Sequence, residues 1–166
     1  MIPRGGRIDF AYDVDRATGQ PADIAAVLDK AALSHRDADH AGRFGVLESA
    51  RAVHVVPVGA RDADGALKAV VSPLDSAIRL GAAEVDGLER LEQILAEVSR
   101  TSGERVIVGT VPVSMLARLE MRFAPSQGNA REALFDLFGE TQAALSWLML
   151  YDPTLRVYVL NVYAVE

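Results

Sequence analysis

The chain of 166 residues contains no cysteine and only two lysines, and aromatic side chains make up 6% of it. The absence of cysteine excludes disulfides, iron–sulfur clusters, cysteine-ligated zinc and thiol nucleophiles. It leaves the compartment open, because such a chain suits oxidising and reducing surroundings equally. No run of 18 apolar residues occurs, so we expect no membrane-spanning segment.

Acidic residues outnumber basic ones by 23 to 17, which gives a formal net charge of −6. Because affinity for nucleic acids comes mainly from neutralising phosphates, we expect no nucleic acid partner. Half of the residues are hydrophobic, which excludes wholesale disorder. A chain of this length buries enough surface to fold without a metal or a disulfide, and no cofactor is expected.

Residues 1–72 are predicted to form an N-terminal β-α-β-β region. Apolar residues alternate with acidic ones in the first strand, and Pro21 and Asp23 mark a helix start. Asp64-Gly65 is a turn signal. In order, a strand, a helix, a polar loop and two strands are expected at residues 8–14, 21–31, 34–40, 44–48 and 53–58, followed by a chain reversal before residues 67–71.

Residues 73–166 are predicted to add a β-α-β-β-α-β-β domain. The expected elements cover residues 74–80, 86–103, 105–111, 118–123, 129–138, 145–151 and 156–165. Helical spacing places five side chains in the core: Leu91, Leu95, Leu134, Leu137 and Phe138. Together the two regions indicate an α+β fold, with helices packed on small mixed sheets around one shared core. The halves echo each other as strand–helix–strand–strand units, through duplication or through the general similarity of short α+β units.

The stretch from Asn129 to Phe138, followed by Ala144-Leu145-Ser146-Trp147, has the spacing of a helix leading into a closing hairpin. With residues 88–98 and the strand after Gly103, it resembles the secretin and TonB-receptor short N-terminal domain. The resemblance covers residues 74–166 and leaves residues 1–72 outside it. It implies a small recognition module of the bacterial cell envelope that contacts another protein. It implies no catalytic residues.

Candidates for chemistry are few. His35, Asp37, Asp39 and His40 are four potential metal ligands, but their spacing matches no known metal motif, so we expect a solvated loop and no metal. Asp9 and Asp13 would lie roughly 13 Å apart on one strand, too far for paired acid–base catalysis. No nucleophile elbow, phosphate loop or dinucleotide fingerprint occurs. The sequence therefore assigns no catalytic residue, and whether the chain is an enzyme stays open.

Two surfaces are candidates for binding. Trp147, Met149 and Tyr151 are expected on one strand face, beside Tyr158 and Tyr163 of the next strand. Trp147, Tyr151 and Tyr158 could form an aromatic surface for a peptide or a glycan, but the core of the sheet is the favoured interpretation.

The second candidate is the segment 118–123, in which Arg118, Glu120 and Arg122 keep one face polar. We predict that it is an edge strand that binds a partner by strand addition, with the arginines favouring an acidic segment. The apolar segment 156–165 is predicted to lie inside its sheet.

The leading hypothesis is a non-enzymatic protein-interaction module of the bacterial envelope. The alternative is a ferredoxin-like ligand binder or enzyme with a site beside the strand of Trp147. The N-terminal residues lack the apolar stretch of a signal peptide, so we expect a cytoplasmic protein or an exported one whose signal is absent from this chain. The resemblance favours a periplasmic or otherwise exported location. The sequence does not fix the oligomeric state.

Overall fold

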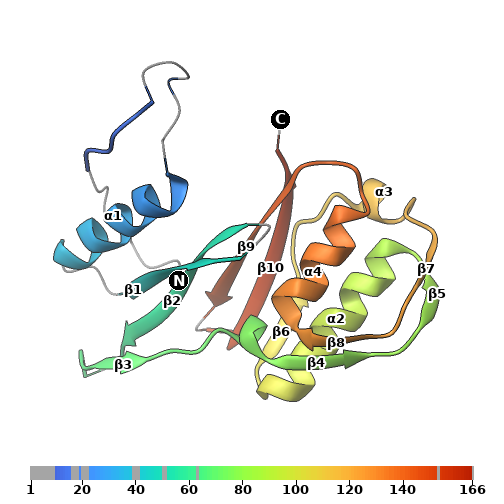
Figure 1. Cartoon of the computed structure of the whole chain (residues 1–166). Coiled ribbons are helices and arrows are strands. Elements are labelled where there is room, and N and C mark those ends of the chain that lie inside the picture. The colour runs from blue at the N-terminus through green and yellow to red at the C-terminus, as the bar shows by residue number, and fades with distance from the viewer. Residues whose placement is uncertain are drawn as a thin grey trace. The chain divides into compact units, whose positions relative to one another are not determined.

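The computed structural model describes residues 10–15, 19, 23–38, 42–49, 52–62, 64–152 and 154–165. The chain divides into two compact units, Pro3–Ser72 and Pro73–Glu166 (Figure 1). Helices and small sheets occur in both, which confirms the expected α+β class. Within the described ranges, no helix combines the length and apolar character that crossing a membrane requires.

The N-terminal unit packs one helix on an antiparallel meander. Asp23 caps the helix by accepting a hydrogen bond from the Ala26 N–H at 3.1 Å. The elements are α1 (Ile24–Asp37), β1 (Gly42–Glu48), β2 (Val53–Arg61) and β3 (Leu67–Ala69), with strand order β1-β2-β3. The hairpin of β1 and β2 and the turn before β3 follow the sequence prediction.

Two expectations for this unit are wrong. The polar loop predicted over 34–40 is helical as far as Asp37, and the Ala38 N–H still donates to the Ser34 carbonyl at 3.0 Å. Its polar residues lie on the exposed end of a helix, which resembles a loop in sequence. The strand predicted over 8–14 shows only a single bridge, at Val14, within its described residues 10–14.

The C-terminal unit contains two long helices and two kinds of sheet. Its elements are η1 (Pro73–Asp75), β4 (Ala77–Leu80), β5 (Ala83–Val85), α2 (Gly87–Ser102), β6 (Arg105–Val108), α3 (Val113–Leu116), β7 (Met121–Phe123), β8 (Ser126–Asn129), α4 (Ala130–Gly139), β9 (Leu145–Asp152) and β10 (Val157–Ala164). One sheet has the order β6-β10-β9, with β10 parallel to β6 and antiparallel to β9. The central position of β10 confirms the placement predicted for 156–165.

The remaining strands form a two-stranded ribbon that is broken at a corner. β4 pairs with β8 and β5 pairs with β7, both antiparallel. At the corner, the buried guanidinium of Arg90 donates to the Gly81 carbonyl at 3.1 Å and to the Ala124 carbonyl at 3.3 Å. It also lies 5.2 Å from the ring centre of Phe123. One side chain of α2 therefore fixes both bends of the ribbon, which a sequence pattern does not reveal.

The core of this unit lies between the helices and the strands. All five side chains predicted to be core are buried, from Leu91 at 0% exposed to Phe138 at 4%. Asp86 and Asn129 cap the two long helices, each accepting a hydrogen bond at 2.8 Å from a backbone N–H of the first turn. Gly103 ends α2 in the left-handed conformation, with a φ of 75°. The helices predicted over 86–103 and 129–138 are therefore confirmed as α2 and α4.

Candidate functional site: strand edges of the C-terminal unit

Each strand at the border of a sheet turns half of its backbone groups away from its neighbour. These groups can bond to a side chain, to water or to a strand of another protein. Among the described strands of the C-terminal unit, β6 and β9 border the three-stranded sheet, and β4, β5, β7 and β8 border the ribbon. The hydrogen-bond partners of these outward N–H and C=O groups differ from one border to the next.

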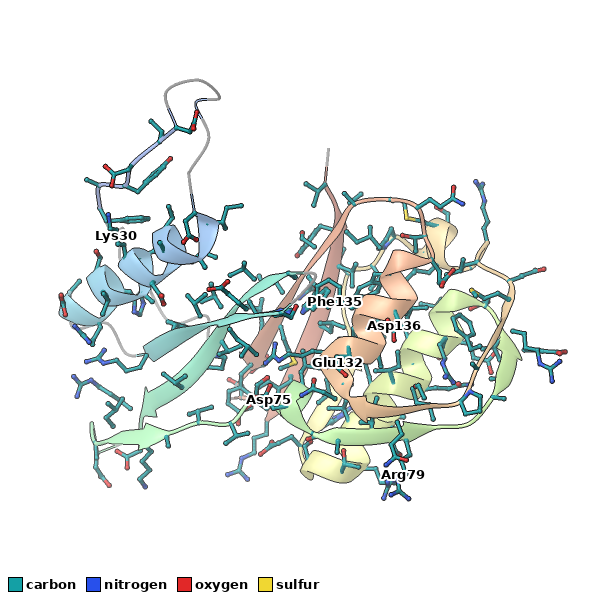
Figure 2. The ribbon with its side chains drawn as sticks, viewed as in Figure 1. Lys30, Asp75, Arg79, Glu132, Phe135 and Asp136 are labelled. Carbon is teal, nitrogen blue, oxygen red and sulfur yellow. The ribbon has the colours of Figure 1, made fainter. Side chains whose placement is uncertain are left out.

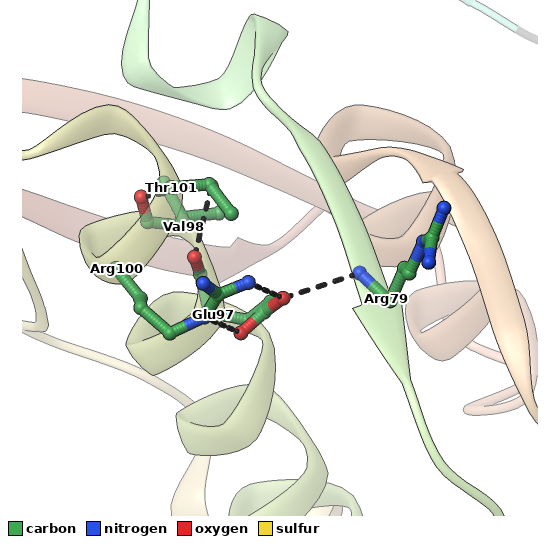
Figure 3. Close-up of polar contacts among 5 residues, drawn as sticks. All are labelled: Arg79, Glu97, Val98, Arg100 and Thr101. Carbon is green, nitrogen blue, oxygen red and sulfur yellow. Dashed lines mark hydrogen bonds and ion pairs between the residues drawn. The ribbon is translucent and has the colours of Figure 1, made fainter.

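The border of β4 is blocked by a side chain of α2. The N–H of Arg79 points away from β8, and the Glu97 carboxylate accepts a hydrogen bond from it at 3.4 Å (Figure 3). Arg100 holds that carboxylate with two hydrogen bonds of 2.7 Å. The hydrogen bonds from Arg100 are the main reason that the pKa of Glu97 falls to about 2, and the Arg79 N–H adds to the effect. The carboxylate is therefore ionised at neutral pH.

The border of β6 is blocked by another side chain of the same helix. The Ser99 hydroxyl accepts a hydrogen bond from the Val106 N–H at 2.9 Å. The Ser99 hydroxyl also lies 3.2 Å from the Val106 carbonyl and 2.8 Å from the Leu95 carbonyl. It can donate a hydrogen bond to either of them. Both outward groups of the strand's central residue therefore face a hydroxyl, which occupies the position that an added strand would take.

The direction of the backbone groups in β10 follows from two hydrogen bonds. The Leu160 carbonyl accepts from the Gly109 N–H on the β6 side, at 2.8 Å. The Val165 N–H donates to the Ala144 carbonyl on the β9 side, also at 2.8 Å. Because neighbouring residues of a strand point in opposite directions, the even-numbered residues of β10 bond to β6 and the odd-numbered residues bond to β9.

In β9 the same rule identifies the outward groups. Asn161 of β10 is opposite Leu148, so the even-numbered residues of β9 bond to β10. The odd-numbered residues then turn their N–H and C=O groups to the other border, and they include Leu145, Met149 and Tyr151. In the described part of the chain no strand pairs with this border, and no hydrogen bond from a side chain blocks these three residues. β9 has eight residues, against three in β7.

The aromatic residues predicted as a binding surface are mostly part of the core. Trp147 is half-buried and packs against Phe135 and Phe138 of α4, with ring centres 4.8 and 5.5 Å apart. Figure 2 shows Phe135 on α4 beside Glu132 and Asp136. The favoured interpretation, a sheet core, therefore holds for Trp147.

The tyrosines of β9 and β10 separate between the two faces of the sheet. Tyr151 and Tyr158 are opposite each other, and their ring centres lie 4.7 Å apart. Burial is the main cause that raises the pKa of Tyr158. Tyr163 is on the opposite face, because it is an odd number of residues from Tyr158, and it therefore lies apart from the candidate surface of Trp147, Tyr151 and Tyr158. Of the predicted aromatic surface, only Tyr151 is exposed, at 43%.

On the sheet face that points away from the helices, apolar side chains lie among Ser146, Asp152 and Asn161. Leu148 and Tyr163 are exposed there at 49% and 46%, and Ile107 of β6 at 37%. Leu150 and Val159 are opposite each other on the same face and are partly buried. The border of β9 is therefore flanked by apolar side chains on this face and by α4 on the other.

The segment 118–123 is a strand over only half of its predicted length. Arg118 lies in a turn after α3, and the Leu119 N–H donates to the Leu116 carbonyl at 3.0 Å. Glu120 has no strand pairing, and β7 comprises only Met121–Phe123. Arg122 lies 3.7 Å from Glu84 of β5, so a nearby carboxylate already offsets its charge. The turn at Ala117 and Arg118, directly after α3, therefore leaves only Met121–Phe123 as a strand.

Other candidate residues form no site in the described ranges. His35 and Asp37 lie on α1, whereas Asp39 and His40 lie outside the described residues. No group of three or more metal-ligand side chains comes together in the part of the chain that is described. Open hollows of the described residues include one of about 500 Å³ in the N-terminal unit and one of about 380 Å³ between α3 and the end of α4. Trp147 borders neither, and Arg118 borders the smaller one.

Reasoning from the sequence missed the border of β9. It identified the strand and its length correctly but placed the border on the alternating segment 118–123. The sequence did contain one usable signal, the difference in apolar content between the two strands of the hairpin. β10 is the more apolar strand and lies inside the sheet, so its hairpin partner β9 lies nearer the border. No protein-family model matches the chain, and no curated protein or solved structure matches it.

Proposed function

We propose that this chain is a non-enzymatic protein-interaction module whose C-terminal unit accepts a strand of a partner protein along β9. One observation carries the proposal: side chains of α2 bond to the outward groups of Arg79 on β4 and of Val106 on β6, whereas no side chain bonds to the outward groups of Leu145, Met149 and Tyr151 on β9. Strand addition obtains affinity from these backbone groups and selectivity from the side chains on either side.

The order of elements supports the bacterial envelope as the place of action. A strand, a helix, two strands, a helix and a closing hairpin follow one another along residues 77–164, apart from the short α3 and the corner in the ribbon. This is the order on which the resemblance to the secretin and TonB-receptor short N-terminal domain rests. A recognition module of that kind contacts another protein, which agrees with a binding border in place of a catalytic cavity.

The test is a comparison of two substitutions at one position. A partner is cross-linked to the full chain in envelope extracts, identified by mass spectrometry, and then titrated as a purified protein. Tyr151→Pro removes the outward N–H, whereas Tyr151→Ala removes the ring and keeps the N–H. We expect Tyr151→Pro to weaken binding about tenfold, the effect of one hydrogen bond, and Tyr151→Ala to weaken it much less.

A matched control uses the blocked border. Ala77→Pro removes an outward N–H from β4 and should leave the affinity unchanged, because the Glu97 carboxylate already occupies the outward N–H of Arg79 on that border. If Ala77→Pro weakens binding and Tyr151→Pro does not, the ribbon is the binding border and the proposal for β9 is wrong. If both variants bind as the unmodified chain does, the partner does not bind by strand addition.

A further inference from the structure

We infer that the segment accepted by β9 is a strand in which basic and aliphatic residues alternate, an inference that rests on the proposed function. Charge is the first argument. Residues 73–166 contain 13 acidic and 8 basic side chains, so 8 − 13 = −5 of the net charge of −6 lies in the C-terminal unit. A basic partner is attracted to this unit, and an acidic one is repelled.

The helix beside β9 concentrates that charge. Glu132 and Glu140 are exposed in the first turn of α4 and at its C-cap. Arg131 is the only basic residue of α4, and it is 8% exposed and bonded to Asp75 at 2.8 Å. The exposed charged side chains of α4 are therefore all acidic.

The two faces of the sheet fix the alternation. On the helix side of β9, the side chains of an added strand would meet the rings of Trp147 and Phe135 and, beyond them, the acidic side chains of α4. Long basic side chains suit this surface, because their apolar stems cover rings while their charged ends reach carboxylates. On the opposite face the central neighbours are Leu148 and Leu150, which favour aliphatic residues, and Ser146 and Asp152 lie nearer the ends of the strand.

A second copy of this chain is a poorer occupant of the same border. Pairing β9 with β9 of another copy would bring two acidic α4 helices toward each other, and like charges oppose such an approach. The acidic segment expected from the arginines of 118–123 is also a poorer fit, since those arginines are not on β9. The charge beside β9 thus favours a basic partner segment, whereas the sequence suggested an acidic one.

The inference can be tested with three synthetic peptides of eight residues, the length of β9. One alternates lysine with valine, one alternates glutamate with valine, and one alternates threonine with valine. Each is titrated into the full chain, labelled with ¹⁵N, and followed by NMR. We expect the lysine peptide to shift the amide signals of Leu145, Met149 and Tyr151, to bind about tenfold more tightly than the threonine peptide, and to weaken with added salt.

Two double variants separate local from overall charge. Glu132→Gln with Glu140→Gln removes two acids beside β9, and Glu89→Gln with Glu92→Gln removes two exposed acids from α2. Glu132 and Glu89 occupy the same position, third in their helices, so the effects of these two substitutions on helix stability are matched. Only the α4 variant should lose the preference for the lysine peptide.

Each other outcome overturns a stated part of the account. If the glutamate or threonine peptide binds β9 as tightly, strand addition stands and the basic partner is wrong. If the lysine peptide binds without shifting β9, or equally in both double variants, it recognises overall charge only. Concentration-dependent dimers with the same β9 shifts would identify a second copy as the occupant. If no peptide shifts β9 and purified partners bind elsewhere, the proposed function itself fails.

Discussion

Asn161 lies so close to Gly109 that no larger side chain fits at position 109. A Cβ atom there would lie 2.5 Å from the Asn161 Oδ1 and 2.5 Å from a methyl carbon of Val159. The same Oδ1 accepts a hydrogen bond from the Thr110 N–H at 2.9 Å. A glycine therefore allows a side chain of β10 to hold the end of β6.

Gly109→Ala should destabilise the protein by about 1–3 kcal/mol, because Asn161 must move and its hydrogen bond to Thr110 is lost. Gly139→Ala is the matched control, since nothing lies within 4 Å of the added methyl group and alanine favours a helix. Urea unfolding of the two variants gives the comparison. Equal stabilities would mean that the contact at Gly109 is not close.

Leu134→Ala should cost about 2–5 kcal/mol, because the side chain is 0% exposed at the centre of the helical core. Leu155→Ala, at a position that is 66% exposed, should change stability by less than about 0.5 kcal/mol. Thermal unfolding followed by circular dichroism distinguishes them. An unchanged melting temperature for Leu134→Ala would contradict the packing of α4.

The ion pair between Arg131 and Asp75 should matter more than the one between Arg122 and Glu84. The side chain of Arg131 is 9% exposed, whereas those of Arg122 and Glu84 are 79% and 78% exposed. Asp75→Asn should therefore cost about 1.5–3 kcal/mol, and Glu84→Gln less than about 1 kcal/mol. Denaturant unfolding tests the order, and a larger loss for Glu84→Gln would refute it.

The pKa of Glu97 predicts a loss of stability in acid. The pKa of this carboxyl is lowered from 4.5 to about 2 by Arg100 and the Arg79 N–H, so the ionised form stabilises the folded state. This contribution is complete above pH 4.5 and disappears as the pH falls through 2. The difference in unfolding free energy between the unmodified chain and Glu97→Gln should shrink over that range. Parallel stability curves would show that the carboxylate is not held.

The helices and the central strand could be predicted because their signals are local. Asp86, Asn129 and Gly103 mark helix ends directly, and Leu160 and Val162 belong to an apolar run that only an inner strand tolerates. The ribbon could not, because it is held by Arg90 across 34 residues of sequence. Polar residues such as Gln127 and Asn129 in β8 carry no strand pattern of their own.

The candidate site was the part of the structure that was hardest to predict from the sequence. Which border of a sheet is open depends on side chains such as Glu97 and Ser99, whose contacts with Arg79 and Val106 exist only in the folded chain. Alternating charge in Arg118, Glu120 and Arg122 suggested a border, but Arg118 lies in a turn, Glu120 has no strand pairing and only Arg122 is in a strand. The strand of Trp147 was predicted correctly, but which of its backbone groups face outward follows only from the register with β10.

Residue-by-residue amide hydrogen exchange in the free protein tests the central claim, an open border on β9, most directly. The account predicts an alternating pattern, in which the amides of Met149 and Tyr151 exchange about 100-fold faster than those of Leu148 and Leu150, which bond to β10. Uniform protection along residues 148–151 would show that another part of the protein already covers this border, and strand addition along β9 would be excluded.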